Sequence, residues 1–187
     1  MTKSFWTVQE IAEKSARLGK RIQQSAYRPD LVVGIKYGGH LVGTHLAKVL
    51  GVPYSPMSVK CRLSTIIPRM PEKFRRFRFL YSALEDLYYL FSQPFIHEPL
   101  AQQIGSEQKV LLVDDDVVLS KTIDVAKNHL LQMGARKENI KTAAMIVHPK
   151  QKENIDFFVE LGEAVFPWSI YSPHYEDFKR SNYAGMM

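Results

Sequence analysis

The sequence predicts an α/β fold in which a parallel β-sheet is flanked by helices. Two short segments, residues 31–35 and 109–113, have the length and the largely apolar composition of strands that are buried on both faces. Segments of helical periodicity precede and follow them, and strands that alternate with helices are typical of parallel sheets. With 187 residues, of which 45% are hydrophobic, the chain is long enough to form one domain around its own core.

The first half of the chain predicts a helix, a buried strand and a second helix. Thr7 and Glu10 have the spacing of a capping box, which predicts a helix from residue 8 onward. Gly38 and Gly39 predict a turn after the strand 31–35, before a helix at 40–50. The next segment, residues 52–59, contains two prolines and therefore predicts an edge strand or an irregular strand.

The second half of the chain carries three adjacent acids, Asp114, Asp115 and Asp116, directly after the predicted strand 109–113. The acids are followed by a short hydroxyl-containing turn and a helical pattern that Gly134 would end. The remaining elements predicted from periodicity are a helix at 120–133 and strands at 142–147, 157–159 and 164–166.

Several classes of protein are excluded or disfavoured by composition. The single cysteine, Cys61, excludes an intramolecular disulfide framework and favours a reducing compartment. No apolar run reaches the roughly 20 residues of a membrane span, and the N-terminus has no secretory apolar region, so we expect a cytoplasmic protein with no membrane partner. The glycines form neither a dinucleotide-binding fingerprint nor a P-loop.

Two strand ends carry residues that suit a sugar phosphate. Ligands of parallel sheets bind beyond the carboxyl ends of the strands. After the strand 31–35 the residues are Lys36, Tyr37, Gly38 and Gly39, and after the strand 109–113 they are the three acids. Adjacent carboxylates accept hydrogen bonds from vicinal hydroxyls or hold Mg²⁺, and a following helix N-terminus attracts phosphate. The alternatives are a simple helix cap and the acidic strand end of a receiver domain.

Three blocks of sequence, in order, resemble the type I phosphoribosyltransferases, and in particular their xanthine/guanine/hypoxanthine branch. Along the chain they are Leu31–Gly43 with the helix after it, Val110–Asp115 followed by a short loop to Thr122, and Val165–Trp168. The resemblance implies a single domain over residues 1–187, with a helical insertion at about 60–108 and a C-terminal base-binding hood at about 148–187. It also implies a homodimer or a higher homo-oligomer.

The resemblance implies Mg²⁺-dependent transfer of the phosphoribosyl group of phosphoribosyl pyrophosphate (PRPP) to a purine-like nucleobase. Asp114 and Asp115 would be the catalytic acids, which bind the ribose hydroxyls and Mg²⁺. The implied 5-phosphate loop consists of Asp116, Val117, Val118, Leu119, Ser120, Lys121 and Thr122. The implied pyrophosphate loop consists of Lys36, Tyr37, Gly38 and Gly39, and the base would contact His148 and Trp168.

Several positions depart from the family pattern. Tyr37 replaces an arginine or lysine, and Leu119-Ser120 replaces Thr-Gly in the phosphate loop. Val118 replaces an acid that could accept a proton from the base, and His148 replaces a lysine. These departures keep a second interpretation open, namely a PRPP- or nucleotide-binding regulator that does not catalyse transfer.

The net charge of +6 lies entirely in one segment, residues 60–80, which contains seven basic residues and a single acid, Glu72. The rest of the chain is neutral. This segment could close over PRPP, form a subunit contact, pack as an amphipathic helix on its own domain, or bind single-stranded nucleic acid through interleaved Arg and Phe side chains. Because PRPP is itself polyanionic, nucleic acid is possible but not the favoured partner.

Overall fold

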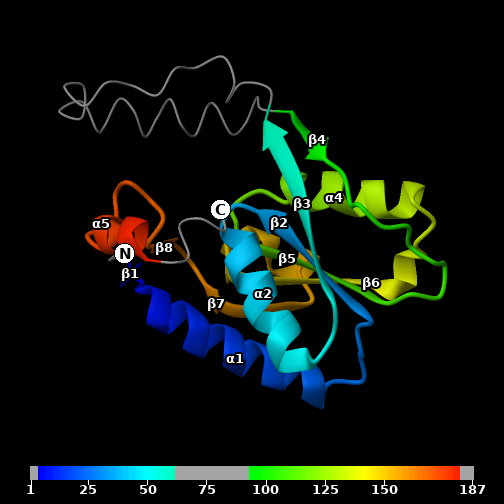
Figure 1. Ribbon diagram of the computed structural model, residues 1–187, viewed down its shortest axis with the longest axis horizontal. Helices are drawn as coiled ribbons and strands as arrows, with labels where there is room; N and C mark the ends of the chain where they lie inside the picture. The colour runs from blue at the N-terminus through cyan, green and yellow to red at the C-terminus, as the bar shows by residue number, and fades with distance from the viewer. Residues whose placement is uncertain (1–3, 62–92, 182–187) are drawn as a thin grey trace.

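A computed structural model of the chain describes residues 4–61 and 93–181 (Figure 1). Its main sheet has six strands in the order β4-β3-β2-β5-β6-β7, and all neighbouring pairs are parallel except β3 and β4. The strands are β2 (Leu31–Lys36), β3 (Tyr54–Cys61), β4 (Pro94–Glu98), β5 (Val110–Val117), β6 (Ile140–Val147) and β7 (Phe157–Leu161). The predicted parallel sheet is therefore confirmed, with one antiparallel strand added at its edge.

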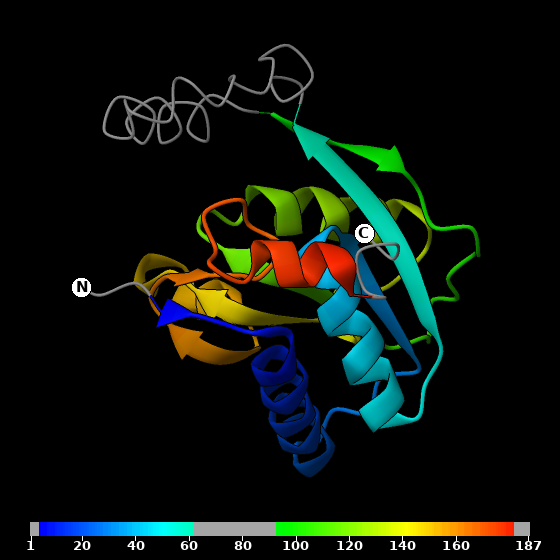
Figure 2. The ribbon, with the colours of Figure 1, turned by 60° about the vertical axis from the view of Figure 1, so that its left-hand side comes forward.

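Helices cover both faces of this sheet (Figures 1 and 2). The helices α1 (Val8–Gln24) and α2 (Gly38–Leu50) pack on one face, and α4 (Lys121–Gln132) packs on the other. Successive strand residues point to opposite faces. Thus Leu111 belongs to the core under α1 and α2, whereas its neighbour Leu112 belongs to the core under α4. Both side chains are fully buried, which explains the continuous apolar runs in the sequence.

The sequence predicted an edge strand or an irregular strand here, and β3 is the irregular one: it lies inside the sheet, between β2 and β4. The antiparallel strand β4 pairs with its outer side, with a register shift between Ser58 and Val59. Sequence periodicity did not predict β4, because it is only five residues long and begins with Pro94. Residues 62–92 of the predicted insertion lie outside the described residues, as does nearly all of the basic segment 60–80.

The ends of the elements follow local sequence signals with two differences. The capping box is present, because the Thr7 hydroxyl accepts from the Glu10 N–H and the Glu10 carboxylate accepts from the Thr7 N–H. Helix α2 begins at Gly38, so the two glycines form its first turn rather than a separate turn, and it ends at Gly51 with φ of 70°. The strand β5 is longer than predicted and includes the three acids.

A small parallel sheet joins the N-terminal end of the described chain to its C-terminal segment. It pairs β1 (Ser4–Phe5) with β8 (Ala164–Val165). Trp6 packs edge-on against Phe166 at 5.5 Å between ring centroids, which fixes the C-terminal segment beside α1. The remaining elements are the 3₁₀ helices η3 (Lys137–Asn139) and η4 (Pro149–Asn154) and the helix α5 (Tyr175–Arg180), which the sequence analysis did not predict. Among the described helices, none is long and apolar enough to span a membrane.

Candidate functional site

The candidate site lies at the carboxyl edge of the parallel strands, where β2, β5 and β6 end. Lys36 ends β2, Val117 ends β5, and the backbone N–H of His148, just beyond β6, donates to the Val117 carbonyl at 3.0 Å. Helices α2 and α4 both begin at this edge, directly after β2 and after the turn that follows β5. Each of the two predicted motifs therefore leads from a strand end into a helix N-terminus.

Gly38 brings three parts of the predicted site together. A Cβ atom on Gly38 would lie 1.9 Å from Oδ2 of Asp115 and 2.5 Å from the ring of Trp168. Gly39 is also closely packed, although less tightly, because its Cβ would lie 2.9 Å from the Val113 carbonyl oxygen. Neither glycine has a positive φ, so what they supply is the absence of a side chain at a point of close approach. Trp168, 53 residues from Asp115 in sequence, thus meets the acids and the glycines at one point.

Two carboxyl groups, those of Asp114 and Asp115, lie side by side at this point. Asp114 is buried, with 8% of its surface exposed. Its Oδ1 accepts the backbone N–H of Asp115 at 2.9 Å, and Oδ2 of Asp115 accepts the indole N–H of Trp168 at 3.0 Å. Burial, together with the neighbouring charge of Asp115, raises the pKa of Asp114 well above its usual value, and burial also raises the pKa of Asp115. Such a pair is suited to neutral hydroxyl donors or to a cation.

Trp168 belongs to an aromatic cluster in the C-terminal segment. One ring contact is a parallel stack on Phe166, at 4.9 Å between centroids and 9° between planes. The other is an edge contact with Phe178 of α5, at 5.9 Å. Phe166 and Phe178 are both buried, whereas Trp168 is only partly buried. The indole is therefore held by the C-terminal segment while its N–H donates to Asp115.

The residues predicted to form the phosphate loop, 116–122, are divided between a strand, a short connection and a helix. Asp116 and Val117 belong to β5, and α4 begins at Lys121. Ser120 has φ of −68°, so the serine that replaces glycine here occupies an ordinary right-handed conformation. Its hydroxyl donates to Oδ2 of Asp124 at 2.7 Å and makes no cap bond to the helix backbone. Val118 is 46% exposed and presents an apolar surface.

The other predicted residues have distinct surroundings. Tyr37 is 55% exposed and follows Lys36 through a cis peptide bond. Lys36 forms an ion pair with Glu98 of β4. Nδ1 of His148 accepts the Lys150 backbone N–H at 3.3 Å, so this nitrogen caps η4. The backbone N–H of His148 donates to Val117 of β5. Among the described residues, no contact joins His148 to Trp168.

Sequence reasoning missed a polar pair beneath the first turn of α2. The hydroxyl of Tyr54 lies 2.7 Å from Nδ1 of His40, and the two rings meet edge-on. Space for the tyrosine ring is made by Gly34 and Gly43, where a Cβ would lie within 3 Å of it. Burial and the charge of Lys36 lower the pKa of His40, which is therefore neutral at pH 7. Those two glycines, nine residues apart, were the only sequence signal.

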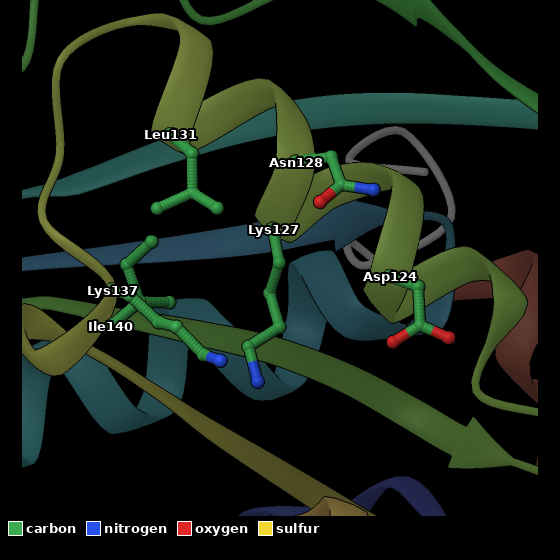
Figure 3. A pocket seen from close by; sticks show the side chains of 6 residues that line it. All are labelled: Asp124, Lys127, Asn128, Leu131, Lys137 and Ile140. Atoms are coloured by element: carbon green, nitrogen blue, oxygen red, sulfur yellow. The ribbon is translucent and has the colours of Figure 1, made fainter.

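A hollow beside α4 and the arrangement of possible metal ligands also bear on the predicted site. A hollow of about 340 Å³ runs along the outward side of α4 (Figure 3), but none of the predicted site residues lines it. Its lining consists of Asp124, Lys127, Asn128, Leu131, Lys137 and Ile140. Over residues 4–61 and 93–181, no group of three or more His, Cys, Asp or Glu side chains is arranged to hold a metal ion. A metal at Asp114 and Asp115 would therefore need oxygens from water or from the ligand.

Comparisons with solved structures establish the fold of the type I phosphoribosyltransferases for this chain. A purine phosphoribosyltransferase from Pyrococcus horikoshii superimposes with a TM-score of 0.68 and 22% identity, covering 91% of this chain and 97% of that one. The Helicobacter pylori xanthine-guanine-hypoxanthine phosphoribosyltransferase gives a TM-score of 0.63 and 14% identity, covering 96% and 100%. No family model and no curated protein matches the sequence.

A third solved structure is a hypothetical protein from Neisseria gonorrhoeae with bound ppGpp. It superimposes with a TM-score of 0.63 and 16% identity, and the match covers 99% of both chains. The resemblance read from the three sequence blocks is thus confirmed as a shared fold over nearly the whole chain. Because all three identities are 22% or lower, activity and ligands have to be argued from the site.

Proposed function

We propose that this protein binds PRPP and a purine-like nucleobase and transfers the phosphoribosyl group to the base, releasing pyrophosphate. The observation that carries the proposal is the meeting of Gly38, Asp115 and Trp168 at one point. In this assignment the glycine loop receives the pyrophosphate, the acids receive the ribose hydroxyls, and the indole lies against the base. Purine phosphoribosyltransferases among the structural neighbours support the same assignment.

The two helix N-termini at the site supply the expected anion contacts. Neither Tyr37, before α2, nor Ser120, before α4, makes a side-chain cap bond, whereas α1 has a complete capping box. A helix N-terminus without a cap offers backbone N–H groups and a positive dipole to an anion. We assign the pyrophosphate to the start of α2 with Lys36, and the 5-phosphate to the start of α4.

The reaction breaks the bond between ribose C1 and the pyrophosphate oxygen, and forms a bond between C1 and a base nitrogen. Positive charge develops on the ribose ring in the transition state, and the carboxylates of Asp114 and Asp115 are placed to stabilise it. Binding both reactants in one orientation supplies much of the remaining acceleration. Mg²⁺, bound with the ligand's oxygens at the acid pair, would supply charge compensation for the pyrophosphate. The base proton has to go to solvent or to the departing pyrophosphate, because Val118 accepts none.

A second candidate is a nucleotide-binding regulator without transfer activity. Val118 in place of a proton acceptor favours it, and so does the Neisseria gonorrhoeae structure with bound ppGpp. A guanine nucleotide that carries pyrophosphate groups would present the same three chemical parts to the site as PRPP and a base together. We expect a homo-oligomer in either case, and the basic segment 60–80 remains a candidate contact for a subunit or for nucleic acid.

The proposal is tested by titration calorimetry with PRPP and Mg²⁺, followed by turnover assays with hypoxanthine, guanine and xanthine. We expect PRPP binding that Asp115→Asn weakens at least tenfold, and nucleotide formation with at least one base. Absence of PRPP binding would contradict the enzyme assignment. Binding of PRPP or ppGpp without turnover on any of the bases would favour the regulator.

A further inference from the structure

The antiparallel edge strand β4 ends in an acid, Glu98, which lies beside Lys36 at the edge of the candidate site. Lys36, the last residue of β2, is in register with Ser58 of β3, and Ser58 is in register with Glu98, the last residue of β4. Residues in register on neighbouring strands point to the same face of a sheet. Lys36 and Glu98 therefore share a face, two strands apart, with Ser58 between them.

The middle residue of this row is what allows the outer two to meet. Strands two apart are separated by about 10 Å, so a large side chain at position 58 would stand between the lysine and the glutamate. Ser58 is small and buried, with 3% of its surface exposed, and the long side chains of Lys36 and Glu98 form an ion pair across it. The ion pair therefore follows from strand register.

Glu98 lies among basic groups. Besides Lys36, the charges of His97 and Lys60 act on its carboxylate, and the hydrogen bond from Lys36 contributes most to lowering its pKa. The Lys36 side chain is 33% exposed and the Glu98 side chain 53%, so solvent and ligands can reach both. A pyrophosphate that binds here would approach a lysine that is already paired with Glu98, and the carboxylate of Glu98 would repel it.

We propose that Glu98 is a specificity-determining residue that weakens binding of pyrophosphate-bearing ligands by competing for Lys36. This inference rests on the proposed function, because it assumes that the pyrophosphate binds beside Lys36. Glu98 should have little effect on a nucleoside monophosphate, whose single phosphate we assign to the start of α4. The residue thereby shifts the balance from substrate, PRPP, toward the nucleotide product.

The test compares Glu98→Gln with a matched control, Glu107→Gln. Glu107 forms an exposed ion pair with Arg136, so its substitution changes the net charge equally, away from the proposed site. Calorimetry with inorganic pyrophosphate, PRPP and a purine nucleoside monophosphate, each with Mg²⁺, is carried out at 50 mM and 500 mM salt. We expect Glu98→Gln to tighten pyrophosphate and PRPP binding by about three- to tenfold at low salt and less at high salt. Monophosphate binding should stay unchanged, as should all binding by Glu107→Gln.

A ligand-free measurement separates failure of this inference from failure of the proposed function. The acetylation rate of Lys36, followed by peptide mass spectrometry, should rise severalfold in Glu98→Gln and not in Glu107→Gln. PRPP binding that Glu98→Gln leaves unchanged or weakens would overturn the role of Glu98 while preserving the proposed function. If no variant binds pyrophosphate or PRPP although Lys36 labelling responds, the proposed function fails and the role of Glu98 fails with it.

Discussion

At the scale of single residues, the two adjacent carboxyl groups of Asp114 and Asp115 are the feature of the site that most destabilises the folded chain at neutral pH. Asp114 is buried and Asp115 is partly buried, so charging both is unfavourable because each loses hydration and repels the other. The indole N–H of Trp168 and one backbone N–H offset part of this cost. Sites that bind a charged or polar ligand commonly retain such a cost in the empty protein, and removing it then stabilises the fold at the expense of binding.

Asp114→Asn should increase the free energy of unfolding by on the order of 1 kcal/mol at pH 7 and abolish PRPP binding. A carboxyl whose pKa is higher in the folded chain binds protons more tightly when folded. Stability of the native sequence therefore falls as pH rises from about 4 through the raised pKa of the pair. The gain in Asp114→Asn should shrink toward zero as pH falls below 4, as measured by urea unfolding across pH.

Asp156→Asn is the control of opposite sign. Asp156 accepts hydrogen bonds from the Lys141 ammonium at 2.7 Å and from the Thr142 N–H at 2.8 Å, and together these outweigh burial and lower the pKa of Asp156. Its stabilising contribution is present at neutral pH and is lost as pH falls, so Asp156→Asn should destabilise the protein at pH 7. Destabilisation by Asp114→Asn at pH 7 would contradict the account of the acid pair.

Gly38→Ala should weaken PRPP binding at least tenfold, as measured by calorimetry. The new methyl group would collide with the Asp115 carboxylate and the Trp168 ring, so the acid, the indole or the loop has to move. Gly105→Ala is the matched control, because nothing lies within 4 Å of its added Cβ. Native-like affinity in Gly38→Ala would show that the ligand does not depend on this close approach.

At the scale of elements, the site depends on segments that are distant in sequence. Helices α2 and α4 follow their strands directly, whereas the segment that carries Trp168 reaches the same edge through η4, β7 and β8. Packing of Trp168 on Phe166 and Phe178 fixes that segment as one unit. Ligand binding at the acid pair should therefore be reported by the indole.

The chain has two tryptophans, so Trp6→Phe leaves Trp168 as the single emitter. We expect PRPP to change the intensity or wavelength of Trp168 emission in this variant, because ribose hydroxyls would take the place of the indole N–H on Asp115. Inorganic phosphate at the same ionic strength is the control and should produce no comparable change. PRPP binding by calorimetry with unaltered emission would mean that the indole N–H and the ligand do not share Asp115.

At the scale of the whole molecule, the ligand should stabilise the folded chain because it connects elements from both halves of the sequence. PRPP at 100 times its dissociation constant would add about 2.7 kcal/mol, which corresponds to a rise in Tm of roughly 5–10 °C for a chain of this size. Thermal unfolding with PRPP and Mg²⁺ measures this rise.

Two variants separate binding from intrinsic stability in that measurement. Asp115→Asn should lose the ligand-dependent rise in Tm. Thr7→Ala removes the cap of α1, so it should lower the free energy of unfolding by about 1 kcal/mol and keep the full rise. A rise that persists in Asp115→Asn would place the ligand elsewhere on the molecule.

The sequence determined the parallel sheet, the helix that Thr7 caps, and the two strand-end motifs, because these depend on local periodicity and capping chemistry. Residues close in sequence supply most of the signal for such features. The three ordered blocks also identified the fold. The strand before the three acids was predicted too short, because hydrogen bonding to β6 extends β5 through Asp116 and Val117, and local pattern does not record that pairing.

Only the tertiary structure decided which predicted residues meet. It brought Gly38, Asp115 and Trp168 together, and it placed Tyr54 against His40 and Glu98 against Lys36. The last two contacts depend on the order and register of β2, β3 and β4, and the short strand β4 has no periodic signal of its own. Strand order is set by packing of the whole core, since the free energy that selects it comes from contacts far apart in the sequence.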